Sequence, residues 1–187
     1  RWLLPVVTVV AAVRCGSGGL ELNTDHDPAF IDLIGGNAQS GVVGQPLTDA
    51  LVVRITDSEH RPVQNQKIRF KLIAGGTGAV LVPDIPMTDA DGQATSAWSL
   101  GQLAGLQKVE ARVVLPGNAA AEGVHFDFTG TAAADVPDTV IAVKGKNQQG
   151  IVGTALTDSL AVAVTDRFGN PIPGQTVNWS VPPGQGS

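Results

Sequence analysis

The sequence has few of the residues that chemistry and covalent cross-linking depend on. It holds one cysteine, one methionine and no tyrosine, and aromatic residues make up 4% of its 187 residues. A single cysteine excludes any disulfide within the chain. Only 16% of residues are charged, and the twelve Lys and Arg are scattered except for Lys67, Arg69 and Lys71. Nucleic-acid binding needs a concentrated basic footprint, so we expect no nucleic-acid partner.

Turn formers and β-branched residues are abundant instead. The chain holds 23 Gly and 12 Pro, and 43% of its residues are hydrophobic. Short runs rich in Val, Ile, Leu and Thr lie between the Gly and Pro residues, which is typical of an all-β protein. This hydrophobic content is enough for a packed core, so the composition argues against wholesale disorder.

Residues 1–15 have the pattern of an export signal. Arg1 precedes an apolar run to Val13 that is too short to span a bilayer but has the length of a signal-peptide core. Cys15 follows, and then a flexible tether over 16–27 that begins with Gly and Ser. This arrangement resembles the signal of bacterial lipoproteins, which implies that Cys15 is lipidated and attaches the chain to a membrane. Cys15 is therefore the candidate lipidation site.

Arg14 departs from the lipoprotein pattern, which places a small residue immediately before the cysteine. A bulky cation at this position leaves two alternatives open, ordinary cleavage without lipidation and an uncleaved anchor. An extracytoplasmic location, at the cell surface or the outer membrane, is the expectation from the signal segment. No Met precedes Arg1, so we also expect that the natural chain starts further upstream.

The strongest pattern is an internal repeat with an offset of 109 residues. The stretch 28–75 aligns without a gap with 137–184 and shares 16 identities in 48 positions, where unrelated sequences would share about three. Such a period is close to the roughly 100 residues of an immunoglobulin-like sandwich. We therefore predict an immunoglobulin-like domain over 28–132, a linker over 133–136 and a partial second domain over 137–187.

Five segments alternate apolar and polar residues with a period of two. They are 51–55, 68–72, 94–100, 109–113 and 124–128, and turn signals separate them at 57–62, 75–78, 89–92 and 116–118. This alternation predicts strands with one buried and one solvated face. The predicted fold is an all-β, immunoglobulin-like β-sandwich with one complete repeat and a truncated second repeat. The apolar face of that second repeat is expected to lack opposing strands; it includes Leu160, Val162, Val164, Val177 and Trp179.

Three phrases of the sequence carry a family resemblance: QSGVVGQPLTDALVVRITD, PVQNQKIRFKLIAGGTG and TDADGQATSAWSLGQLAGLQKVEARV. They resemble bacterial immunoglobulin-like domains of the invasin/intimin type. The second repeat keeps the Gly-Asn-Pro turn of that family at Gly169-Asn170-Pro171, whereas the first has His60-Arg61-Pro62. The resemblance implies a non-catalytic surface protein whose repeats form a spacer or adhesin stalk. Its partner would be a host or cell-surface protein or polysaccharide, held by a tip domain outside this sequence.

The residues able to bind a metal do not form a recognisable motif. His26, His60 and His125 have no partner at a metal-binding spacing, so we interpret them as surface residues. The stretch Asp89–Gly92 begins like a calcium loop but has Leu100 at the twelfth position, so a hairpin turn is the better interpretation. Calcium between the domains would need about seven converging oxygen ligands, more than the nearby acids Asp25, Asp27, Asp135 and Asp138 readily supply.

No constellation of catalytic residues is recognisable either. The sequence has no Gly-x-Ser-x-Gly elbow, and Gly75–Gly78 lacks the lysine and the helix of a phosphate-binding loop. Trp98 and Trp179 lie on the apolar faces of their segments, which favours a core role over a sugar-binding platform. We expect no enzyme activity, no cofactor and no metal site. The alternative functions are a protein- or carbohydrate-binding module and the accessory region of a secreted enzyme.

Overall fold

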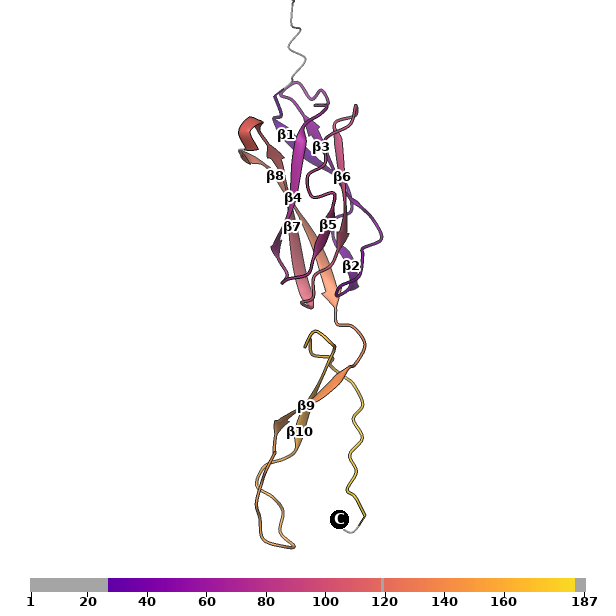
Figure 1. The fold of residues 1–187 in the computed structure, drawn as a ribbon, viewed down its shortest axis with the longest axis vertical. Coiled ribbons are helices and arrows are strands. Elements are labelled where there is room, and N and C mark those ends of the chain that lie inside the picture. The colour runs from indigo at the N-terminus through magenta and orange to yellow at the C-terminus, as the bar shows by residue number, and fades with distance from the viewer. Residues whose placement is uncertain (1–26, 119, 184–187) are drawn as a thin grey trace, which may run out of the picture.

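The computed structural model describes residues 27–118 and 120–183. It places two units end to end along one long axis (Figure 1). The first unit is a sandwich of two four-stranded sheets, whereas the second contains a two-stranded sheet and irregular chain. The candidate lipidation site Cys15, the predicted signal segment and His26 lie outside the described residues.

The first unit has the strand order of an immunoglobulin-like sandwich. One sheet has the order β1 (Phe30–Gly35), β3 (Leu51–Thr56), β6 (Gln93–Ser99) and β5 (Val80–Val82), with all neighbours antiparallel. The other has the order β2 (Gln39–Val42), β8 (Ala120–Ala133), β7 (Gly105–Val114) and β4 (Lys67–Ala74), with β2 parallel to β8. In the usual lettering these are an ABED sheet and a CFG sheet extended by one edge strand. The predicted fold class is confirmed.

The five segments predicted from alternation lie within β3, β4, β6, β7 and β8, except that Leu100 directly follows the end of β6. Their inward side chains form one core, which includes Leu51, Val53, Ile55, Ile68, Phe70, Trp98, Val109, Ala111, Val113 and Phe128. Trp98 fills the centre with 1% of its surface exposed. The backbone of β8 passes so close to the indole that a Cβ at Gly130 would lie 2.8 Å from it. Glycine is therefore needed at this position.

Three strands of the first unit were not predicted, and each has a weak pattern. β1 lies at the edge of its sheet with mostly exposed residues, and β2 and β5 have four and three residues. Short or exposed edge strands do not need a continuous apolar face, so period-two alternation does not mark them.

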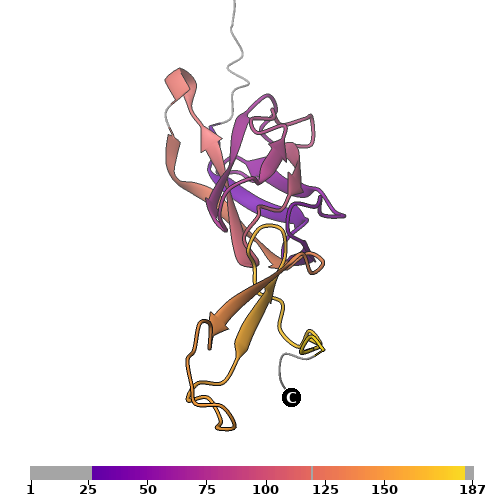
Figure 2. The same cartoon turned by 60° about the horizontal axis from the view of Figure 1, so that its bottom comes forward.

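The second unit repeats the backbone of the first. β9 (Thr139–Lys144) pairs with β10 (Ala161–Thr165), and Thr139 lies opposite Thr165 as Phe30 lies opposite Thr56. Gln148 bonds to Gly145 and Asp158 as Gln39 bonds to Gly36 and Asp49. Figure 2 shows this two-stranded sheet in orange beside the end of the sandwich. The offset of 109 residues therefore recurs in the strand register and in the hydrogen bonds.

The apolar face predicted for the second unit is exposed only in part: Leu160 and Trp179 are exposed, Val162 and Val177 are half-buried, and Val164 is buried. Exposed side chains include Val140, Ile141, Val143, Leu160 and Trp179. The interpretation of Trp179 as a core residue is wrong in this structure: it is 58% exposed, and 176–180 forms no strand. The physical reason is that the described part of the second unit offers no equivalents of β6, β7 and β8 to cover the indole.

Candidate functional site

The most specific polar arrangement lies where the two units meet. It joins residues 166–170, which we name the junction loop, to residues 101–104 between β6 and β7, which we name the receiving loop. The side-chain amide of Asn170 accepts a hydrogen bond from the Ala104 N–H at 2.8 Å and donates to the Gln102 carbonyl at 2.8 Å. Its other N–H donates to the Asp166 carboxylate at 2.8 Å. Asn170 is 4% exposed, and the three bonds satisfy its acceptor and both its donors.

Asp166 organises the junction loop and holds the linker. One carboxylate oxygen accepts from the backbone N–H groups of Phe168 and Asn170 at 2.9 and 2.8 Å. The other accepts from the Asp135 N–H at 3.0 Å as well as from the Asn170 amide. Burial alone would raise the pKa of Asp166, but the hydrogen bonds from Asn170, Asp135 and Phe168 outweigh it and lower the pKa to about 2. The carboxylate is therefore ionised at neutral pH.

Two further side chains of the junction loop contact their surroundings. The Arg167 guanidinium lies 4.7 Å from the centre of the Phe168 ring and 3.3 Å from the Asp135 carboxylate. Phe168 packs against the core of the first unit, and a Cβ added at Gly44 would lie 3.5 Å from its ring. The ion pair is partly exposed and contributes little, so the polar bonds of Asn170 and the packing of Phe168 define the contact.

Gln107 braces the receiving loop from inside the sandwich. Its side chain is fully buried, accepts from the Gly101 N–H at 2.7 Å, and donates to the Gly101 and Leu103 carbonyls at 3.2 and 2.8 Å. Gly75 lets the chain pass this close, because a Cβ there would lie 2.3 Å from Gln107. Sequence reasoning missed this residue. The available signal was a polar side chain at a core-facing position of β7, in line with Val109 and Ala111.

The acidic residues predicted to lie in turns and linker do lie there. Asp89 accepts from the backbone N–H groups of Asp91 and Gln93 at 2.9 Å, which confirms the tight turn before β6. Asp135 bonds the Val136 N–H and pairs with Arg167, and Asp138 accepts from the Thr139 hydroxyl. Neither Asp135 nor Asp138 belongs to a group of three metal-ligating side chains within the described residues.

His60 and His125 are exposed, as interpreted, but the expectation that His125 has no acidic partner is wrong. His125 has acidic neighbours, because the register of β7 and β8 brings it beside Glu110 and Asp127, and one ligand atom of each lies within 4.8 Å of the others. Spacing along the chain could not reveal Glu110, which comes from another strand. The Arg112 guanidinium already holds both Glu110 oxygens at 2.8 and 2.5 Å, and it lowers the Glu110 pKa. A cation would have to displace Arg112. His60 stacks on the Phe30 ring at 5.0 Å.

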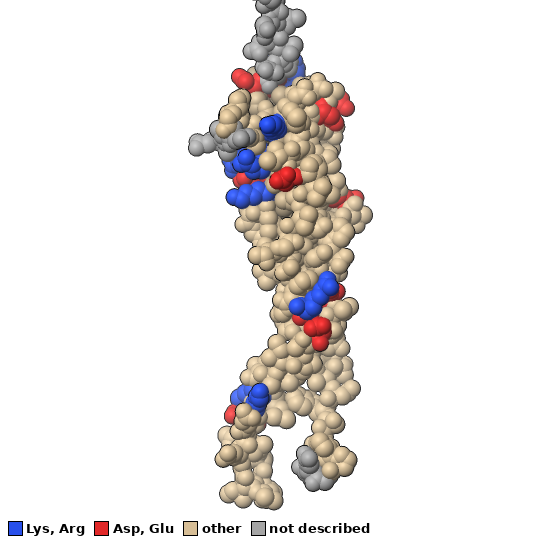
Figure 3. Space-filling view, in the orientation of Figure 1, with Lys and Arg blue, Asp and Glu red and all other residues tan. Residues whose placement is uncertain are grey.

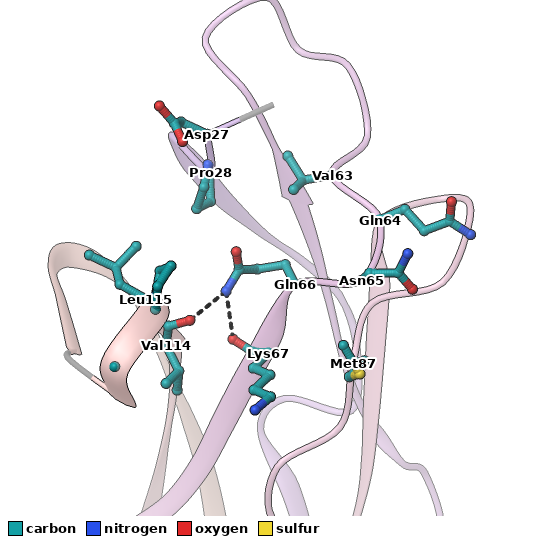
Figure 4. A pocket seen from close by; sticks show the side chains of 12 residues that line it. Asp27, Pro28, Val63, Gln64, Asn65, Gln66, Lys67, Met87, Val114 and Leu115 are labelled. Carbon is teal, nitrogen blue, oxygen red and sulfur yellow. Dashed lines mark hydrogen bonds between the residues drawn. The ribbon is translucent and has the colours of Figure 1, made fainter. Parts of the chain in front are cut away.

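A hollow of about 330 Å³ opens at the end of the first unit that lies away from the second unit (Figure 4). Gln66 lies at its centre and donates from its amide to the Val114 and Lys67 carbonyls at 2.7 and 3.0 Å. Among the twelve lining residues, Asp27 is the one carboxylate and Lys67 the one amine. Among the described residues, no histidine, cysteine, serine or threonine lines the hollow, so these residues supply no hydroxyl or thiol nucleophile paired with an imidazole base.

Comparisons with known proteins give no family. No protein-family model matches the chain, and no curated protein matches it. A solved structure described as WR4, a C. elegans MSP family member, is similar over 56% of this chain and 99% of that one, at 14% identity and a TM-score of 0.35. Within the described residues, no helix has the length and apolar character needed to cross a membrane.

Proposed function

We propose that the chain is part of an exported, non-catalytic surface protein whose immunoglobulin-like units, of the invasin/intimin type, act as a stalk or spacer. The observation that carries this proposal is the junction, where Asn170 is bonded to two residues of the receiving loop, Gln102 and Ala104. A fixed contact between successive units keeps them in line. A spacer needs this property, whereas a flexible string of domains does not supply it.

The linker supports the same role. It is short, and its Asp135 N–H is bonded to Asp166 at 3.0 Å while its Asp135 carboxylate pairs with Arg167. Two units that share hydrogen bonds across so short a connection have little freedom to bend. In this proposal Cys15 carries the lipid that attaches the stalk to the membrane, and a partner binds further along the protein.

Whole-cell labelling tests the proposal. The chain is expressed in bacteria with an epitope tag after Ser187, and radioactive fatty acid is supplied. We expect label on the wild type but not on Cys15→Ser, and antibody access to the tag on intact cells carrying the wild type. A tag reached only after the cells are permeabilised would contradict export to the surface. Equal labelling of both chains, or of neither, would contradict attachment through Cys15.

A further inference from the structure

The outward surface of strands β4, β7 and β8 gathers basic side chains from distant parts of the sequence. We name it the basic face; its residues are Lys67, Arg69, Lys71, Lys108, Glu110, Arg112, His125, Asp127 and Thr129. The strand register places Arg69 opposite Arg112, and Arg112 opposite His125. Figure 3 shows blue side chains clustered on the upper part of the first unit, above a long stretch without them.

Charge is divided unevenly between this face and the remaining chain. The basic face holds five of the twelve Lys and Arg but two of the 17 acids, so the other residues carry seven basic against 15 acidic side chains. Like charges directly opposite each other destabilise a sheet. Glu110 already neutralises Arg112, so Arg69 is the member of this cross-strand pair whose charge an anionic partner would neutralise.

Most of the positive charge is not neutralised within the protein. Arg112 and Glu110 hold each other at 2.8 and 2.5 Å and cancel in charge. Lys67, Arg69, Lys71 and Lys108 form no ion pair with any residue in 27–118 or 120–183. Lys67 and Lys71 are exposed, and Arg69 and Lys108 are half-buried.

The shape of the basic face selects the kind of anion. Alternate residues of a strand are about 7 Å apart, so Lys67, Arg69 and Lys71 form a straight row of about 13 Å. Arg69 and Lys71 lie on the open surface of the sheet, and Lys67, at the end of the row, also lines the hollow at the end of the unit. An open row of this length suits an extended polymer better than a small anion. Apart from the His125 imidazole, none of its nine residues has a ring on which nucleic-acid bases could stack. None of the nine is apolar; Leu106 and Ile73, further along the outward sides of β7 and β4, are exposed, but two separate aliphatic side chains offer little apolar area to anchor a bilayer.

We propose that the basic face binds a linear acidic polysaccharide through its carboxylate or sulfate groups. We choose a polysaccharide because the proposed function places the protein outside the cytoplasm. The position of the binding surface is inferred from the charges alone. The site belongs to the first unit itself and needs no tip domain. It would let a stalk lie along, or pass through, an acidic polysaccharide layer.

Binding of the full chain to immobilised heparin and to polygalacturonate at low ionic strength tests this proposal and distinguishes sulfate from carboxylate. Lys67→Gln with Lys71→Gln removes two charges from the face, and Lys144→Gln with Lys146→Gln removes two exposed charges elsewhere. We expect roughly tenfold weaker binding for the first pair and less than about twofold for the second. Asp127→Asn should tighten binding, by about twofold, which a folding defect cannot produce.

Three results would overturn the proposal: equal weakening by the two pairs, no binding to either polysaccharide, or tighter binding to duplex DNA or to phosphatidylglycerol vesicles. These measurements use the purified chain, so their failure would leave the whole-cell test of surface attachment unaffected.

Discussion

Both units carry the same loop, after β3 in the first and after β10 in the second, and within residues 27–118 and 120–183 the second loop bonds to the other unit whereas the first bonds back to its own aspartate. In the first unit Asp57 accepts from the backbone N–H groups of Glu59 and Arg61 at 2.9 Å. In the second, Asp166 accepts from Phe168 and Asn170 at 2.9 and 2.8 Å. Each loop also closes through the same pair of backbone bonds, at 3.0 Å. The shared aspartate therefore fixes the shape of the loop.

The four residues that follow the shared aspartate decide which contacts the loop makes. The first loop has Ser58, Glu59, His60 and Arg61, and the second has Arg167, Phe168, Gly169 and Asn170 in their places. Arg61 turns back to the Asp57 carboxylate at 2.8 Å, whereas Asn170 reaches the receiving loop of the other unit. The repeat thus conserves the scaffold of the loop and changes the side chains that dock it.

The two repeat tryptophans should differ most in their effect on stability. Trp98 is 1% exposed and Trp179 is 58% exposed. Trp98→Ala should cost the first unit about 3–5 kcal/mol, as truncation of a buried aromatic does, and Trp179→Ala should cost it almost nothing. Chemical denaturation followed by circular dichroism measures both. A cost near zero for Trp98→Ala would place that indole at the surface and favour the sugar-platform alternative.

The sequence pattern predicted the sandwich well, because a strand with one buried face has an apolar residue at every second position. Trp98 and Val109 are where that pattern placed them. The contact at the junction has a weaker signal in the sequence. The Gly169-Asn170-Pro171 turn was recognisable as a turn, but nothing along the chain indicates that Asn170 bonds to residues 66 and 68 positions earlier. Contacts between units depend on how the units sit in space, which local periodicity does not encode.

Replacement of Gln107 should have the next largest effect. Gln107→Leu keeps the volume but leaves the Gly101 N–H and two carbonyls without their partner. Loss of buried hydrogen bonds of this kind should lower the free energy of unfolding of the first unit by about 1–3 kcal/mol. Gln45→Leu is the matched control, because Gln45 is exposed and its replacement should stay within about 0.5 kcal/mol. Equal costs would show that the buried bonds contribute nothing specific.

Acid should release the junction loop. The pKa of Asp166 is lowered to about 2, and an unfolded aspartate titrates near 3.9. Asp166 therefore contributes stability that is fully present above about pH 4 and is lost as the pH falls toward 2. We expect the chemical shift of the Ala104 amide proton to approach that of Asn170→Ala over this range. Asp57→Asn should leave this titration unchanged. A transition centred above pH 4, or none, would argue against the role of Asp166.

The docking of the junction loop can be tested directly by hydrogen exchange at one amide, the Ala104 N–H that donates to Asn170. The test variant gives the second loop the residues of the first: Arg167→Ser, Phe168→Glu, Gly169→His and Asn170→Arg. The control variant makes the reverse change: Ser58→Arg, Glu59→Phe, His60→Gly and Arg61→Asn. We predict exchange roughly tenfold faster in the test variant, equivalent to one lost hydrogen bond, and an unchanged rate in the control. The same rate in the wild type and both variants would contradict a docked junction.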